Sequence, residues 1–398
     1  NNLTLCFIWF FFRYKQKSRL LIITNYIYMK IIITKENLIK ALQKIIGVVE
    51  KRQATPILSH VLFRKNNGSF EAVASDLEVQ LSSKIIFDGE SSFSENTTIP
   101  GRKLFDIGKG LPDGAVLEIE KAEEGKLQIT SKKSKFTLSA LDAKTFPLMD
   151  TEDENSLAFT VKSKDFKEII EKTSFAMAQQ DVRHYLNGLF INISQKEIFG
   201  VATDGHRLAK AGVNVDTGVE KDINAIIPRK GIIEIEKQLE EEQNINAVIS
   251  KNHLEISSNG AQAITKLVDG NFPDFQKVIP KDADKTVLVD CKSFKEVLTR
   301  VSILSNDSFK GVILNFLENE IKVSAKNREK EEATDNIKST YDGDPIEIGF
   351  NVNYLLDVIN AIKTKNIQIQ LKDAASSALI KPENDNASNY VVMPVRPS

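Results

Sequence analysis

One pattern of apolar and polar positions occurs three times along the chain. Apolar residues fall at i, i+3, i+4 and i+7 in segments 35–45, 163–173 and 291–301. The three segments begin at even spacing, here called the repeat interval, which runs from Lys35 to Ser163 and from Ser163 to Cys291. The pattern within each segment places the apolar side chains in one stripe on an α-helix. It predicts three equivalent amphipathic helices.

The repeat extends beyond these helices. Thr203-Asp204 lies one repeat interval after Ser75-Asp76, and Pro228 lies one repeat interval after Pro100. The third copy is shorter by five residues, so the spacing from Asp204 to Asn327 is five residues less than the repeat interval. A repeat of this length matches a usual domain size. We predict three tandem domains at residues 29–150, 151–282 and 283–398.

Each copy has the same predicted order of elements. An apolar strand precedes the amphipathic helix, strands rich in β-branched and aromatic residues follow, and further strands close the copy. A second helix is predicted at 102–110, 229–239 and 353–362. Two helices segregated from the strands indicate an α+β fold, with helices packed on antiparallel sheets.

Residues 1–28 do not follow the repeat. They contain the single tryptophan, Trp9, and an apolar run that precedes its basic residues. A signal peptide has the opposite order, and about ten residues are too few to span a bilayer. We interpret 1–28 as a non-native or disordered extension; a membrane-associating tail is the alternative. Without its four basic residues, 49 Lys and Arg remain against 54 Asp and Glu.

Cysteine and histidine usage predicts no metal and no cofactor. Cys6, Cys291 and the four histidines form no metal-ligand spacing. Two cysteines also form no disulfide framework, which favours a reducing cytoplasm.

Basic residues recur on the predicted helices although the chain is acidic. The second helix of copy two is the exception, because Glu234, Glu236 and the run Glu240–Glu242 just after it outnumber its lysines. Six helices packed about 10 Å apart enclose a hole too narrow for a duplex, whereas twelve helices from two chains leave roughly 28 Å. A dimer of such chains could encircle DNA.

Several motifs in order resemble one known family, the bacterial DNA polymerase III β subunit or sliding clamp. The similarity covers residues 29–396. The motifs are Thr55–Leu58, Ala178–Arg183, Ala202–Ala209, Leu267–Pro273, Ile303–Asn306 and Tyr390–Arg396.

The resemblance implies a DNA clamp fold and a head-to-tail homodimeric ring of six domains, without catalysis. Such a ring slides on double-stranded DNA as a processivity factor, through electrostatic contacts that read no sequence. The implied partners are the replicative polymerase, the clamp loader and other proteins with a clamp-binding motif. The implied location is the cytoplasm, at the nucleoid, with no membrane partner.

The resemblance also implies three sets of site residues. The DNA-contacting set is Arg52, Gln179, Gln180, Tyr185, Arg229 and Lys230. Gln179 stands where a histidine is common in the family. The set lining a partner-peptide groove between copies two and three is Thr203, Gly205, His206, Arg207, Leu208, Pro273, Lys277, Val278, Ser377, Val391, Met393, Pro394 and Arg396.

The third set is the dimer interface. Phe136 is expected to pack against Ile303 and Leu304 of the next chain. Facing charges are expected between the lysines and the glutamates of this set, which are Lys133, Lys135, Glu329, Glu331 and Glu332. Copy one has Ser75-Asp76-Leu77-Glu78 in place of the TDGHRL sequence, so one groove per chain is predicted.

Two other functions fit parts of the sequence. A hydrolase could use Asp204 and His206 with Ser302 or Ser305, but no nucleophile elbow, P-loop or zinc-protease motif accompanies them. A repeat scaffold that binds proteins without DNA is the second alternative.

Overall fold

The computed structural model describes residues 29–50, 55–66, 68–88, 91, 95–123, 125–240, 242–306 and 310–395. The chain forms two compact units. The first ends at Asp150 and also includes Gly260–Gln262, and the second contains Thr151–Asn259 and Ala263–Ser398. The expectations for residues 1–28, Arg52 and Arg396 fall outside the described residues.

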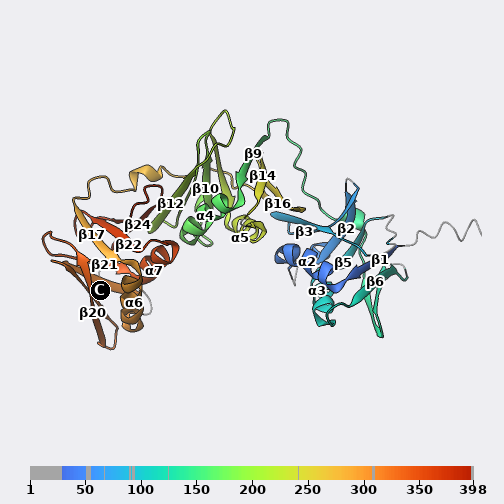
Figure 1. Cartoon of the computed structure of the whole chain (residues 1–398), viewed down its shortest axis with the longest axis horizontal. Coiled ribbons are helices and arrows are strands. Elements are labelled where there is room, and N and C mark those ends of the chain that lie inside the picture. Colours follow the sequence, from blue (N-terminus) through green and yellow to red (C-terminus); the bar gives the residue numbers. More distant parts are fainter. Residues whose placement is uncertain are drawn as a thin grey trace, which may run out of the picture. The chain divides into compact units, whose positions relative to one another are not determined.

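The first unit contains two helices and two antiparallel sheets (Figure 1). Helices α2 (Lys35–Ile45) and α3 (Gly101–Gly110) pack against each other, and α2 also contacts β3 and β4. One sheet has the order β1-β6-β7-β8, and the other contains β5-β2-β3-β4. The strands are β1 (Lys30–Thr34), β2 (His60–Asn66), β3 (Ser69–Ser75), β4 (Val79–Ile85), β5 (Thr97–Pro100), β6 (Val116–Lys121), β7 (Lys126–Ser131) and β8 (Ser134–Ser139).

The second unit begins with copy two, which has the same plan. Helix α4 (Ser163–Thr173) packs on β11 and β12 and contacts α5 (Arg229–Gln238). The strand orders are β13-β10-β11-β12 and β16-β15-β14-β9. The strands are β9 (Leu157–Lys162), β10 (Gly188–Ile193), β11 (Glu197–Thr203), β12 (Arg207–Asn214), β13 (Ile223–Pro228), β14 (Asn244–Ile249), β15 (His253–Ser258) and β16 (Ala261–Lys266).

Copy three completes the second unit. Helix α6 (Cys291–Val301) packs on β19 and β20 and contacts α7 (Val352–Ala361). Strand β24 pairs with β12, so copies two and three share one sheet, whose order from β12 is β24-β23-β22-β17-β20-β19-β18-β21. The strands are β17 (Lys285–Asp290), β18 (Gly311–Leu317), β19 (Glu320–Lys326), β20 (Glu332–Thr340), β21 (Ile346–Asn351), β22 (Asn366–Leu371), β23 (Ala378–Pro382) and β24 (Asn389–Val392).

Short 3₁₀ helices connect several of these elements. They are η1 (Ile46–Val48), η2 (Pro56–Ser59), η3 (Ala143–Thr145), η4 (Ser174–Ala176), η5 (His184–Leu186), η6 (Phe275–Lys277) and η7 (Ser302–Leu304).

The periodicity located the helices well. Helices α2, α4 and α6 have the predicted bounds, and their apolar stripes are buried, as Leu38, Phe166 and Phe294 illustrate. Helix α3 begins one residue earlier than predicted, at Gly101, where a side chain would come within 2.8 Å of Val61 Cγ2. The predicted α+β fold of three similar tandem copies is confirmed. No helix in the described ranges is long and apolar enough to cross a membrane.

Candidate functional site

A pocket of about 160 Å³ lies in the second unit. It is formed where the ends of β11, β12 and β24 meet η5 and the segment that follows β16. The lining residues are Arg183, Tyr185, Leu186, Thr203, Gly205, His206, Arg207, Pro273, Val278, Val391 and Met393. Eight of them belong to the predicted groove set; Arg183, Tyr185 and Leu186 do not.

Among the described residues, four members of the predicted groove set do not line this pocket. Leu208 is buried beneath it, in a cluster with Val201, Leu379 and Val391. Lys277 is exposed and forms an ion pair with Asp274 at 3.1 Å. The other two are Ser377, which precedes β23, and Pro394, which follows β24. Arg396 lies outside the described residues.

A closed turn between β11 and β12 forms one wall of the pocket. Asp204 Oδ1 accepts hydrogen bonds from the backbone N–H groups of His206, at 2.9 Å, and Arg207, at 3.1 Å. The Thr203 hydroxyl donates to the carbonyl of Arg207 at 2.6 Å. Gly205 has a φ of 89°, which favours glycine. Asp204 thus closes the turn and does not orient the His206 ring as a base.

Arg207 connects this turn to copy three. Its guanidinium donates to the Asp204 carboxylate at 3.1 Å and to the Phe175 carbonyl at 2.7 Å. It also pairs with Asp357 and lies 4.6 Å from the centre of the Tyr354 ring. Because Asp357 and Tyr354 are on α7, these contacts fix the position of the turn relative to that helix.

The pairing of β12 with β24 forms the floor of the pocket. Leu208 is opposite Val391 in this ladder, and the backbone N–H of Met393 donates to the His206 carbonyl at 2.9 Å. Val391 is buried, whereas the Met393 side chain is 38% exposed. An exposed methionine beside branched apolar residues gives an adaptable apolar surface.

Arg183 is a pocket residue that the sequence reasoning missed, although it ends one of the motifs. Its guanidinium donates to both carboxylate oxygens of Asp181, at 3.0 and 2.9 Å. The same contact lowers the pKa of Asp181 to about 2. The salt bridge holds Arg183 beside Gly205, where a side chain would approach Arg183 Nη2 to 3.2 Å.

Five of the six residues predicted to contact DNA lie around one loop of copy two; the sixth, Arg52 of copy one, is outside the described residues. Gln179 and Gln180 are exposed in the loop that precedes η5. Arg229 begins α5, and its guanidinium donates to the Met177 carbonyl at 3.4 Å, so the loop and the helix start are adjacent. Lys230 follows it in the first turn of α5. Tyr185 lines the pocket.

The residues predicted for the dimer interface lie at accessible positions. Phe136 is half-buried on β8, an edge strand of its sheet, and Lys133 and Lys135 are exposed beside it. Ile303 is 78% exposed in η7, and Leu304 is half-buried. The three glutamates of the set are exposed.

Glu332 already has a partner within its own chain. It forms an ion pair with Lys326, and this contact lowers the pKa of Glu332. An ion pair with another chain would therefore compete with this one.

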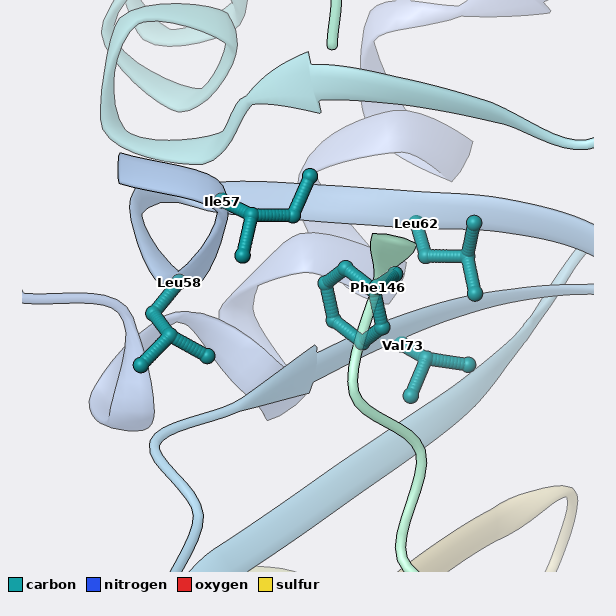
Figure 2. Close-up of a cluster of buried hydrophobic side chains, with 5 residues drawn as sticks. All are labelled: Ile57, Leu58, Leu62, Val73 and Phe146. Carbon is teal, nitrogen blue, oxygen red and sulfur yellow. The ribbon is translucent and has the colours of Figure 1, made fainter. Parts of the chain in front are cut away.

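Copy one has a buried cluster where copy two has the pocket. Ile57, Leu58, Leu62 and Val73 pack around Phe146, which is 6% exposed (Figure 2). The repeat interval places Tyr185 and Leu186 at the positions of Ile57 and Leu58.

Three similar helix-and-sheet copies in tandem, with one apolar pocket where the second and third share a sheet, define a three-domain clamp protein. Family models of the DNA polymerase III beta subunit match the whole series of copies. The N-terminal domain model matches residues 29–150, the central domain 160–274 and the C-terminal domain 276–396.

Individual proteins agree with these models. The chain is 40% identical to the beta sliding clamp of Pseudomonas putida over 369 residues, which cover 92% of this chain and 100% of that protein. It is 38% identical to the Escherichia coli beta sliding clamp with the same coverage. A crystal structure of the Pseudomonas aeruginosa sliding clamp bound to griselimycin matches with a TM-score of 0.88 and 39% identity, over 93% of this chain and 100% of that one.

The chain therefore belongs to the DNA polymerase III beta subunit family, the beta sliding clamps. Members of this family are non-catalytic processivity subunits, so neither the hydrolase nor the scaffold alternative is favoured.

Proposed function

We propose that this chain works as a processivity clamp: two copies join head to tail into a ring that encircles double-stranded DNA and tethers the replicative polymerase. The observation that carries the proposal is the similarity to beta sliding clamps over their full length. The three tandem copies supply half of a ring of six domains, with boundaries proposed at 150/151 and 282/283. The proposed location is the cytoplasm, at the nucleoid.

The DNA-facing surface is proposed to include the loop of Gln179 and Gln180 and the start of α5. Arg229 and Lys230 supply positive charge there, and Arg229 also holds the loop through the Met177 carbonyl. Amide and cationic side chains contact phosphate oxygens without reading bases. Such contacts allow sliding and weaken as salt rises. Arg52 and Tyr185 belong to the same proposal.

The ring joint is proposed to form between β8 of one chain and the η7 region of the next. An exposed Ile303 and a half-buried Phe136 supply apolar surface. Lys133 and Lys135 supply positive charge opposite the glutamates at 329, 331 and 332. Complementary charge at the rim favours the head-to-tail orientation over other pairings.

The pocket is proposed to bind short apolar peptide motifs of the replicative polymerase, the clamp loader and other partners. Its walls combine Leu186, Pro273 and Val278 with the Val391–Met393 floor. A few convergent polar groups beside apolar walls are typical of a specific binding site. The other residues of the predicted groove set, including Arg396, complete the proposed groove around this pocket.

Loading onto circular DNA tests the proposed function. The clamp is placed on a nicked circular plasmid by its clamp loader, separated from free protein by gel filtration, and the plasmid is then cut at one site. A topological ring stays on the circle for many minutes and leaves after linearisation. Equal loss from circular and linear DNA would refute the ring.

A further inference from the structure

The segment that connects copies two and three, residues 269–283 and here called the strap, supplies two residues to the pocket. Pro273 and Val278 line it. The position of the strap therefore determines the position of one wall of the pocket. Unlike the floor, this wall is not part of a strand or a long helix, since η6 is the strap's only regular element.

Hydrogen bonds hold the chain just before the strap but not the strap itself. The backbone N–H of Val268 donates to the Ile226 carbonyl at 2.9 Å, just before the strap begins. In the part of the chain that the structure describes, no backbone hydrogen bond joins residues 269–283 to another segment. A weak ion pair between Asp282 and Lys372, at 3.9 Å and largely exposed, is the polar tie near its far end.

Aromatic packing takes the place of these bonds. Phe272 stacks on Phe190 of β10 with ring centres 5.0 Å apart. Phe275 lies edge-on to Phe199 of β11 at 5.9 Å, and 6.1 Å from Phe190. Lys210 Nζ lies 4.6 Å from the Phe199 ring centre and 5.9 Å from that of Phe275. Two strap residues are thereby attached to the sheet of copy two.

The open space beside the strap increases the importance of this packing. A second hollow, of about 510 Å³, lies between β13 and the start of the strap, with Phe190, Ile226 and Phe272 among its lining residues. Phe272 and Phe275 face the sheet while Pro273 and Val278 face the pocket, so a shift of the rings would move the pocket wall.

The geometry points to Phe199 and Phe275 as positioning residues: they hold the strap where Pro273 and Val278 complete the pocket, and so set its affinity for partner peptides. This inference rests on the proposed peptide-binding role of the pocket. If the competent strap position falls to about one tenth of the population, the apparent Kd rises about tenfold. The effect acts on affinity and not on the ring.

The test uses the full-length dimer and a fluorescent peptide that carries the clamp-binding motif of its replicative polymerase. Phe275→Ala is expected to raise the Kd about tenfold, and Phe275→Leu, which keeps apolar volume, is expected to recover most of the loss. The matched control is Phe87→Ala, which removes an aromatic pair with Phe70 in the first unit and should leave the Kd unchanged. Unchanged affinity in Phe275→Ala would overturn the inference.

A double-mutant cycle separates positioning from a general loss of structure. Phe275→Ala and Val278→Ala should be non-additive, because both disable the same wall, whereas Phe275→Ala and Thr203→Ala on the opposite wall should be additive. Additivity in both cycles would contradict the inference.

Met393→Asp tests the pocket itself. If this variant binds the peptide normally, the proposed peptide site is wrong. If Met393→Asp abolishes peptide binding while Phe275→Ala has no effect, only the inference about the strap is wrong.

Discussion

Equivalent positions of copies one and two have different roles: they are buried in a core cluster in copy one, whereas two of them line a pocket in copy two. Ile57, Leu58, Leu62 and Val73 lie one repeat interval before Tyr185, Leu186, Phe190 and Val201. In copy one these positions enclose a buried Phe146, whereas in copy two Tyr185 and Leu186 line the pocket and Phe190 and Val201 belong to the apolar cluster beside it.

The difference comes from the segment that leaves each copy. Phe272 follows Phe146 at a spacing two short of the repeat interval. It stacks on Phe190, and Pro273 beside it remains exposed as a pocket wall. Phe146 is thus buried in copy one, whereas the corresponding Phe272 is only half-buried and the pocket stays open beside it.

The largest expected effect is the loss of stability when the Phe146 ring is removed from the buried cluster of copy one. Phe146→Ala removes the centre of the copy-one cluster and should lower the free energy of unfolding of the first unit by about 3–5 kcal/mol. Denaturant unfolding followed by a probe in that unit measures it. Phe87→Ala, at a half-buried aromatic pair, is the control and should cost only about 1 kcal/mol. A cost for Phe146→Ala no larger than that of the control would mean that the ring does not fill this cluster.

A charge in the open site should have the next largest effect. Met393→Asp places a carboxylate against apolar walls, so peptide affinity should fall by about a hundredfold or more. Fluorescence anisotropy measures the peptide, and analytical ultracentrifugation measures the dimer, which should be unchanged. Loss of dimerisation in this variant would contradict the assignment of Met393 to the pocket.

The sequence predicted α2, α4 and α6 because their apolar residues recur within about ten residues, with a period that helix geometry sets. It also predicted most pocket residues, but only through the resemblance. Arg183 and Leu186 were missed, since they lie in or beside the short helix η5, whose position against the β11–β12 turn does not follow from the local pattern. The role of Phe146 was missed as well. The Phe-Pro pairs read alike in both copies, and spacing along the chain does not show which ring becomes buried.

The smallest expected effect concerns β8, the edge strand proposed to form the ring joint. Lys133→Glu with Lys135→Glu should weaken the dimer several-fold at low salt, because exposed ion pairs contribute about 0–1 kcal/mol each. The effect should disappear at high salt. Lys84→Glu, at another exposed lysine of the first unit, is the charge-matched control for a single reversal. Salt-independent weakening would point to damage to β8 and away from charge pairing.

One measurement tests the proposed ring and the proposed peptide site together. The clamp is loaded on nicked circular DNA with the fluorescent partner peptide, and the DNA-bound fraction is isolated before and after linearisation. We expect one peptide per clamp chain on the circle and neither peptide nor clamp on the linear DNA. Peptide and clamp that remain on linear DNA, or two peptides per chain, would contradict it.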